Sequence, residues 1–441
     1  MSIDESSDAN LIPTTIIDEE AEFKTNIEFT EIMDGDCLTR ILKKFTKGYK
    51  TQTIISMISS SLTLITFSLP YTIETSGILV SFGLCLIIFF FTFFTMYILL
   101  EVILKTNAVN YHQLIYAHVG QKMCIVYEIF NFLYLFSLII IQQIFSYLLI
   151  YNIFKVGFGI YMDETVEKYL ILLIPMVIQI PLSLLKKFNQ LSLFTMICAG
   201  IIIVYIFVSF FCLMFNLSER KKELPLYPVN MNVFYTYAIF TILFGSHNIL
   251  FSIFNQFMLK TKKRSTDVIL YSHLIEILIF LIMTVIGYFY STNSESLSNI
   301  IILQARSIPI LIVQILLVIC IQFLIPISIT NIKECIKNTI SNAPLTTQPL
   351  SLAKDIVITI IVLLLGNVCV FFTQEVKLFI GISGGICSGI ICYVIPYFVY
   401  CKIFEESNYK HYLGFVIMLL NFLASGTATV HSFIDLARTA S

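Results

Sequence analysis

The chain has 441 residues, of which 57% are hydrophobic and 12% are charged, and its formal net charge is −1 at pH 7. A water-facing surface needs roughly a quarter of all residues to be charged, so this composition excludes an ordinary soluble globular protein. Because its mean hydropathy is +0.88, we expect an integral membrane protein.

Residues 1–36 differ in composition from the rest of the chain. They are rich in Asp and Glu, contain Lys24 as their only basic residue and include no long apolar run. Such a segment cannot bury enough apolar surface to offset the entropy lost on folding. We therefore predict that residues 1–50 form a disordered acidic cytosolic tail, which ends in a basic juxtamembrane segment.

The remaining chain is a series of long apolar runs. A helix that crosses the bilayer needs about 20 mainly apolar residues, and the runs are continuous rather than alternating, which favours helices over a β-barrel. We predict an all-α integral membrane protein with about eleven membrane-spanning helices. The expected spans are 53–74, 78–104, 124–154, 169–185, 190–214, 232–257, 268–290, 307–330, 353–373, 377–400 and 411–433.

The positions of Lys and Arg predict the orientation of these spans, because cytoplasmic loops retain positive charge during insertion. A cytosolic N-terminus leaves few basic residues on the opposite side of the membrane, and an odd number of spans then places the C-terminal tail outside the cytosol. The basic residues on that opposite side are Lys155, Lys168, Arg220, Lys221, Lys222, Arg306, Lys377 and Arg438.

The first span contains a proline that indicates an interrupted helix. Pro70 disfavours helical geometry at Leu69 and suits the first turn of a new half-helix. Such a half-helix would direct free N–H groups and its positive end at the middle of the membrane, where the carboxylate of an amino acid could bind. The alternative is a simple proline kink, in which Thr66 and Ser68 bond back to carbonyls of their own helix.

The sixth span contains a second candidate interruption. Gly245 is followed by Ser246, His247 and Asn248 inside an otherwise apolar run. Polar residues at that depth usually line a cavity, and spans 1 and 6 would be equivalent positions in two inverted five-helix halves. For His247 we expect a structural or gating role at the edge of the site rather than direct contact with the solute.

Several segments together resemble one family of transporters. They are SLPYTIETSGI in span 1, IPLSLLKKFNQLSLFTMICAG across spans 4 and 5, FGSHNILFSIFNQF in span 6, GYFYS in span 7, FLIPISI in span 8 and GGICSGIICYVIPYFVY in span 10. In this order and spacing they resemble the amino acid/auxin permease family of the amino acid, polyamine and organocation transporter superfamily.

The resemblance implies a fold and a function. It implies a five-plus-five inverted repeat in which spans 1 and 6 are broken, with residues 51–214 and 215–400 as the two halves. Residues 401–441 would then form an eleventh helix and a short non-cytosolic tail. The resemblance also implies amino acids as substrates and, in many members, coupling to protons or sodium.

Two departures from the family pattern bear on recognition and coupling. Thr63, Leu64 and Ile65 occupy the positions where the family usually has Gly-x-Gly, and such side chains hinder close approach of the backbone to a substrate. A sodium site would need hydroxyl oxygens from span 8, yet the only polar side chains between Ile308 and Pro326 are Gln314 and Gln322. We therefore expect altered substrate recognition, and sodium coupling is disfavoured.

Proton coupling requires a titratable group in a cavity. The candidates are Glu74, Glu101, Glu128, His247 and Glu276. Solvation at a span end is the simpler reading of Glu74 and Glu101, and Glu128 falls in a cytosolic extension of span 3. Glu276 is the deepest acid and is our candidate for proton coupling. The alternative for Glu276 is an ion pair with the basic loop that contains Lys262, Lys263 and Arg264.

We predict a secondary transporter for amino acids or related small solutes that works by alternating access, with spans 3 and 8 as walls. The solute carboxylate would bind near Thr63, Leu64, Ile65, Thr66 and Ser68, and its amine near Phe244, Gly245, Ser246, His247 and Asn248. The membrane would be the plasma membrane or a vacuolar or endolysosomal one. A nutrient sensor with the same fold is the alternative. No pattern indicates an enzyme, a cofactor, a metal site or a nucleic-acid partner.

Overall fold

The computed structural model describes residues 50–157, 159, 164–184, 191–215, 225–227, 233–256, 261–290, 308–340, 351–373, 375–405 and 408–440. Every regular element within these ranges is helical. The expected acidic tail lies outside the described residues.

The first five spans are formed by helices of unequal regularity. Span 1 consists of α3 (Lys50–Ser61), the 3-10 helix η1 (Leu64–Ser68) and the beginning of α4 (Leu69–Thr106), and the rest of α4 is span 2. The short helix α5 (Tyr111–His118) then leads into span 3. Spans 3, 4 and 5 are α6 (Gln121–Asn152) with its extension η2 (Ile153–Gly157), α7 (Glu164–Ser183) and α8 (Leu191–Phe215).

The remaining spans include a second divided helix, in span 6, and an irregular one, in span 10. Span 6 is split into α9 (Val233–Leu243) and α10 (His247–Gln256), and spans 7, 8 and 9 are α11 (Lys262–Tyr290), α12 (Ile308–Ile340) and α13 (Leu352–Phe372). Span 10 is irregular and consists of α14 (Val376–Ile380), η6 (Gly381–Cys387), η7 (Ile390–Val394) and α15 (Ile395–Ile403). Span 11 is α16 (Tyr409–Ala440).

A single glycine separates spans 1 and 2. Within the described residues, ten helices are long and apolar enough to cross a membrane, because the second half of span 1 continues into span 2 across Gly77. Gly77 has φ 72°, a left-handed conformation that favours glycine. The amide of Ile78 donates a hydrogen bond of 2.9 Å to the carbonyl of Pro225, which holds this corner. The expected architecture of about eleven spans is thus confirmed.

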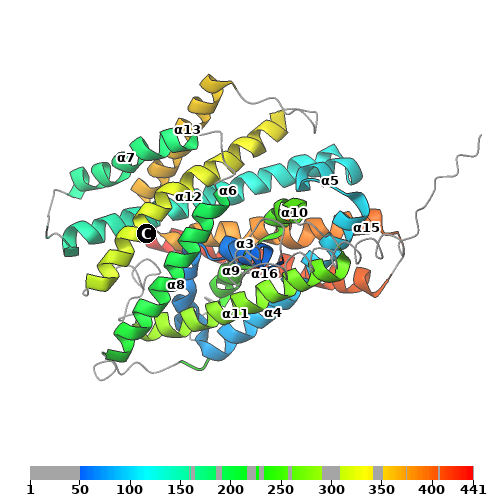
Figure 1. The fold of residues 1–441 in the computed structure, drawn as a ribbon, viewed down its shortest axis with the longest axis horizontal. Helices are drawn as coiled ribbons and strands as arrows, with labels where there is room; N and C mark the ends of the chain where they lie inside the picture. Colours follow the sequence, from blue (N-terminus) through cyan, green and yellow to red (C-terminus); the bar gives the residue numbers. More distant parts are fainter. Residues whose placement is uncertain are drawn as a thin grey trace, which may run out of the picture.

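The helices pack in pairs that reflect two equivalent halves. Spans 2 and 7 pack together as α4 and α11, spans 3 and 8 as α6 and α12, and spans 4 and 9 as α7 and α13. In Figure 1, α7 and α13 lie on one side of the bundle, α4 and α11 on the other, and α3, α9 and α10 lie between them. The inverted arrangement therefore places spans 1 and 6 at the centre.

The outer helices face lipid, and the central ones are buried. Large apolar side chains are exposed on α7, α8, α13 and α16, for example Val177, Phe211, Leu365 and Phe422. Spans 6 and 10 are the most deeply buried of the candidate spans. The glycines of span 10 permit this close packing.

A side chain at several of those glycines would collide with a neighbouring helix. A Cβ added at Gly385 or Gly389 would meet α16 at Thr429 or Ser425, and one at Gly384 would meet the backbone of Ala238 in α9. Small residues in membrane helices commonly serve such close approach.

Candidate functional site

The break in span 1 lies earlier than the proline that indicated it. The helix α4 begins at Leu69 with Pro70 in its first turn, as expected for a new half-helix. The non-helical residues, however, are Leu62 and Thr63, and Thr63 is extended with φ −105° and ψ 177°. The intervening 3-10 helix η1 carries the chain from this break into α4. The simple proline kink is thereby excluded.

The break in span 6 lies where the sequence indicated it. The helix α9 ends at Leu243, Phe244 to Ser246 are not helical, and α10 begins at His247. A Cβ at Gly245 would lie 2.9 Å from the carbonyl oxygen of Thr241, so glycine is required for this tight passage. The carbonyl of Ser246 accepts hydrogen bonds from the amides of Ile249 and Leu250 and so begins α10.

The two breaks lie side by side with opposite chain directions. The first half of span 1, α3, contacts the second half of span 6, α10, whereas η1 contacts α9. Spans 1 and 6 are therefore antiparallel, and each break presents a helix end to the other. This is the geometry in which half-helix dipoles and unwound backbone form midplane binding sites.

A polar cavity of about 390 Å³ opens beside the breaks. Span 1 contributes residues 59–63 and span 6 contributes Gly245, Ser246 and Asn248. The walls are α6 and α12, the expected spans 3 and 8, with a smaller share from α8. The cavity continues to residues 109–112 at the beginning of α5.

Four of the ten residues expected at the substrate site line this cavity. They are Thr63, Gly245, Ser246 and Asn248. The other six do not line it. Four of these six, Leu64, Ile65, Thr66 and Ser68, are buried in η1, and Phe244 and His247 are buried beside the break of span 6. The 3-10 helix turns its residues into the protein, which the position of Pro70 could not reveal.

Each break contributes to the cavity lining one residue whose side-chain hydroxyl is unpaired. Thr63 Oγ1 and Ser246 Oγ are both buried and have no hydrogen-bond partner among the described residues. Leaving a buried hydroxyl unpaired costs about 1–3 kcal/mol. Both hydroxyls are therefore suited to a polar ligand.

His247 is held away from the cavity. It is fully buried, its Nε2 lies 2.9 Å from Thr95 Oγ1, and its ring packs edge-on against Tyr393. This placement favours the expected structural or gating role over direct contact with a solute.

Glu276 does not pair with the basic loop at the start of α11. Its Oε1 accepts a hydrogen bond of 2.8 Å from Ser61, the last residue of α3, and its Oε2 lies 3.0 Å from Nδ1 of His273. Lys262 instead pairs with Glu101 at 2.7 Å. Glu276 is thus attached to the break of span 1.

The other acidic candidates have structural partners. Glu101 is not solvated as expected, because it is buried between Lys262 and Lys410. Glu128 lies 2.5 Å from Nδ1 of His112 and receives a hydrogen bond from Asn338 of α12. These contacts tie helices together at the end of the bundle that carries α5.

Asn131, in the middle of α6, is a site residue that sequence reasoning missed. It lines the cavity and accepts a hydrogen bond of 3.1 Å from Asn248. Tyr127, one turn earlier, donates to the side-chain oxygen of Asn248 at 3.3 Å. An amide side chain inside the apolar run of span 3 was the signal that could have found it.

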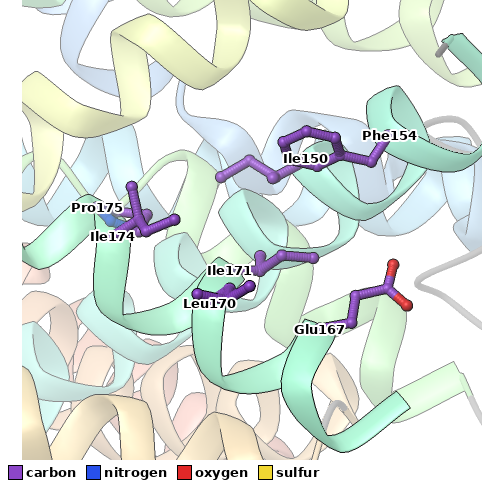
Figure 2. Close-up of a pocket in the computed structure, with 7 residues that line it drawn as sticks. All are labelled: Ile150, Phe154, Glu167, Leu170, Ile171, Ile174 and Pro175. Carbon is purple, nitrogen blue, oxygen red and sulfur yellow. The ribbon is translucent and has the colours of Figure 1, made fainter. Parts of the chain in front are cut away.

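A second hollow lies between α6, η2 and α7 and has a different character. Its volume is about 260 Å³, and Figure 2 shows the side chains around it: Ile150, Phe154, Glu167, Leu170, Ile171, Ile174 and Pro175. Glu167 is its one charged residue. A zwitterion needs several polar partners, so this hollow is not the candidate substrate site.

Comparison with known proteins agrees with the resemblance seen in the sequence. The family model described as "Transmembrane amino acid transporter protein" matches residues 47–433. Among solved structures, one described as the substrate-bound outward-open state of a Na⁺-coupled sialic acid symporter is similar with a TM-score of 0.46 and 12% sequence identity. That match covers 88% of this chain and 90% of the other.

Proposed function

Because the chain belongs to the family of transmembrane amino acid transporter proteins, we propose that it carries amino acids or related small solutes by alternating access. The solute binds between the breaks of spans 1 and 6, with α6 and α12 as the walls of its cavity. No covalent chemistry forms part of this proposal.

The observation that carries the proposal is the pair of unpaired hydroxyls, Thr63 Oγ1 and Ser246 Oγ, one from each break. A solute carboxylate at the Thr63 side accepts a hydrogen bond from that hydroxyl. The ammonium group lies near the end of α9, where backbone carbonyls carry the negative end of the helix dipole. Asn248 then contacts the remaining part of the solute.

We propose protons rather than sodium as the coupling ion, if transport is coupled at all. The two glutamines of span 8 already have partners, since Gln322 donates to Ser146 at 3.0 Å and Gln314 accepts from Asn152 at 3.1 Å. Glu276 remains the proton-coupling candidate, because it is fully buried and bonded to the end of α3.

With a cytosolic N-terminus, the cavity would open toward the cytosolic end of the bundle at α5, as expected of an inward-facing state. The protein would reside in the plasma membrane or a vacuolar or endolysosomal membrane. Residues 51–214 and 215–400 would be the two inverted five-helix repeats, followed by the eleventh helix, and one bundle of helices would rock against a scaffold formed by the others.

Uptake by purified protein in proteoliposomes tests the proposal. The probe is a labelled mixture of the common L-amino acids, and saturable uptake is expected from the intact chain. Thr63→Val and Ser246→Ala each remove one hydroxyl and should raise KM by roughly tenfold, since hydrogen bonds to charged groups contribute about 1.5–3 kcal/mol.

A matched control is Thr427→Val, whose hydroxyl is exposed on α16 and bonds to its own helix. Absence of saturable uptake by the unmodified protein would overturn the proposal. Saturable binding without uptake would instead favour the nutrient sensor.

A further inference from the structure

A buried acid–base pair lies at the junction of both breaks. His273 and Glu276 are one turn apart on α11, and both side chains are 0% exposed. At about 1.5 Å per residue, Glu276 lies about 21 Å along the helix from Lys262, near the middle of α11, which is long and apolar enough to span a membrane. Ionisable residues at that depth are costly and commonly functional.

The pair contacts each of the two breaks directly. Ser61, the final residue of α3, donates a hydrogen bond of 2.8 Å to Glu276 Oε1. On the other side the ring of His273 packs against Phe244, the first residue of the span 6 break, with ring centroids 5.9 Å apart. A change at this pair therefore reaches both halves of the proposed solute site.

Among the described residues, no Lys or Arg forms an ion pair with Glu276. His273 Nδ1, His273 Nε2 and Glu276 Oε2 form no hydrogen bond in the part of the chain that the structure describes, so the 3.0 Å approach of Nδ1 to Oε2 is a close contact without hydrogen-bond geometry. Phe89 of α4 packs edge-on against the ring of His273 at a centroid distance of 6.4 Å. With Glu276 ionised and His273 neutral the pair carries a charge of −1, and binding one proton makes it neutral. That neutral state is far less costly in a low-dielectric interior.

The neighbouring elements bring few other charges to the pair. His247 of α10 is close enough to interact electrostatically with His273. Near the beginning of α11, Lys50 of α3 pairs with Asp267, and Glu101 of α4 pairs with Lys262.

Uncharged titratable side chains on the packed elements complete this set. The element η1 has none in its sequence, and α4 and α8 bring Tyr71, Cys85, Tyr97, Cys198, Tyr205 and Cys212. The helix α4 also carries the charged residues Glu74 and Lys105.

We propose that Glu276 and His273 form a single proton-binding site whose protonation releases the end of α3 through Ser61, and so couples proton movement to solute transport. A hydroxyl binds a carboxylate more strongly than it binds a neutral carboxylic acid. The ionised pair therefore holds Ser61 and the end of α3 in place, and the protonated pair loosens them. This inference rests on the proposed transport function.

Two transport measurements on Glu276→Gln separate this inference from the proposed function. The variant mimics the protonated acid, so exchange of the labelled L-amino acid mixture without a pH gradient should persist. Accumulation driven by an acidic exterior should be lost. If the unmodified protein shows neither exchange nor accumulation, the proposed function fails. If Glu276→Gln still accumulates solute like the unmodified protein, only the proton site is overturned.

Hydrogen exchange of residues 50–61 decides the case in which Glu276→Gln loses both activities. In the unmodified protein, the protection factors of the α3 amides, after correction for the intrinsic pH dependence of exchange, should fall on acidification. In Glu276→Gln and Ser61→Ala, α3 should be loose at every pH. Unchanged protection of α3 in both variants would overturn the inference.

The control for both assays is Thr284→Ala. This buried residue on α11 bonds only to the carbonyl of Phe280 in its own helix among the described contacts. It should leave exchange, accumulation and α3 protection unchanged.

His273→Leu tests whether the pair acts as one site. Nδ1 of His273 lies 3.0 Å from Oε2 of Glu276, so an apolar side chain in its place removes a polar neighbour of the carboxylate, and the midpoint of proton-driven accumulation should move to higher pH. An unchanged midpoint, or a shift to lower pH, would show that His273 is no part of the proton site.

Discussion

The side chain of Asn248 donates a hydrogen bond of 3.1 Å to that of Asn131 and thereby ties α10 to α6. Asn248 lies in the first turn of α10, directly after the span 6 break, whereas Asn131 belongs to a wall of the cavity. The bond therefore joins an element that is expected to move during transport to one that is expected to stay fixed.

Asn131→Ala should weaken solute binding without unfolding the protein. The change leaves the amide of Asn248 without its acceptor, and the net loss of one such bond is about 1 kcal/mol. We expect KM for amino acid uptake to rise roughly fivefold, with the thermal midpoint nearly unchanged. Leu133→Ala is the control, because Leu133 is an exposed side chain of the same helix. Equal KM values for the two variants would contradict the prediction.

Glu101→Gln should destabilise the end of the bundle that carries α5. Glu101 lies between Lys410 at 2.6 Å and Lys262 at 2.7 Å, and so connects α4 to α16 and α11. The side chain of Lys262 is half exposed, so solvent screens its ion pair with Glu101. Most of the lost stability should therefore come from the ion pair with Lys410, which is more buried. We expect a fall of several degrees in the thermal midpoint of detergent-solubilised protein. The variant Lys262→Gln should fall by less, and the reverse order would refute this account.

The breaks could be predicted from sequence because each is caused by local chemistry. Pro70 must lie in the first turn of a helix, and Gly245 allows a passage that a Cβ would block. The exact position of the first break was not accessible, because a 3-10 helix inserted between Thr63 and Leu69 depends on packing against α9 rather than on local propensity.

The partners of the acidic residues illustrate what sequence alone could not reveal. Glu276 is bonded to Ser61, which is 215 positions away, and only the folded arrangement of spans 1 and 7 brings them together. His273, by contrast, lies three positions before Glu276 on the same helix. That spacing places both side chains on one face of the helix, and it was a signal in the sequence that our sequence analysis did not use.

The docking of α5 should depend on pH. Contacts with the Cys124 thiol and the Glu128 carboxylate raise the pKa of His112 to about 9. A raised pKa means that the folded state binds the proton more tightly, so this stabilisation is fully present below about pH 6.5 and is lost as pH rises through about 9. Limited proteolysis near α5 should therefore accelerate in that range. His112→Gln should remove this pH dependence, and its persistence in the variant would contradict the assignment to His112.

Gly77→Ala should disrupt the corner between spans 1 and 2. Gly77 has a φ of 72°, and an added Cβ would lie 2.8 Å from the backbone of Tyr227, so both strain and collision oppose the substitution. We expect a loss of stability of more than about 1 kcal/mol, seen as a lower thermal midpoint and a smaller monodisperse fraction in size-exclusion chromatography. Gly83→Ala is the matched control in the same helix, because a Cβ there meets nothing within 4 Å. Since alanine favours a helix interior over glycine, that variant should be as stable as the unmodified protein or more so. Equal stability of the two variants would show that the corner tolerates a side chain and that the left-handed conformation of Gly77 is not required.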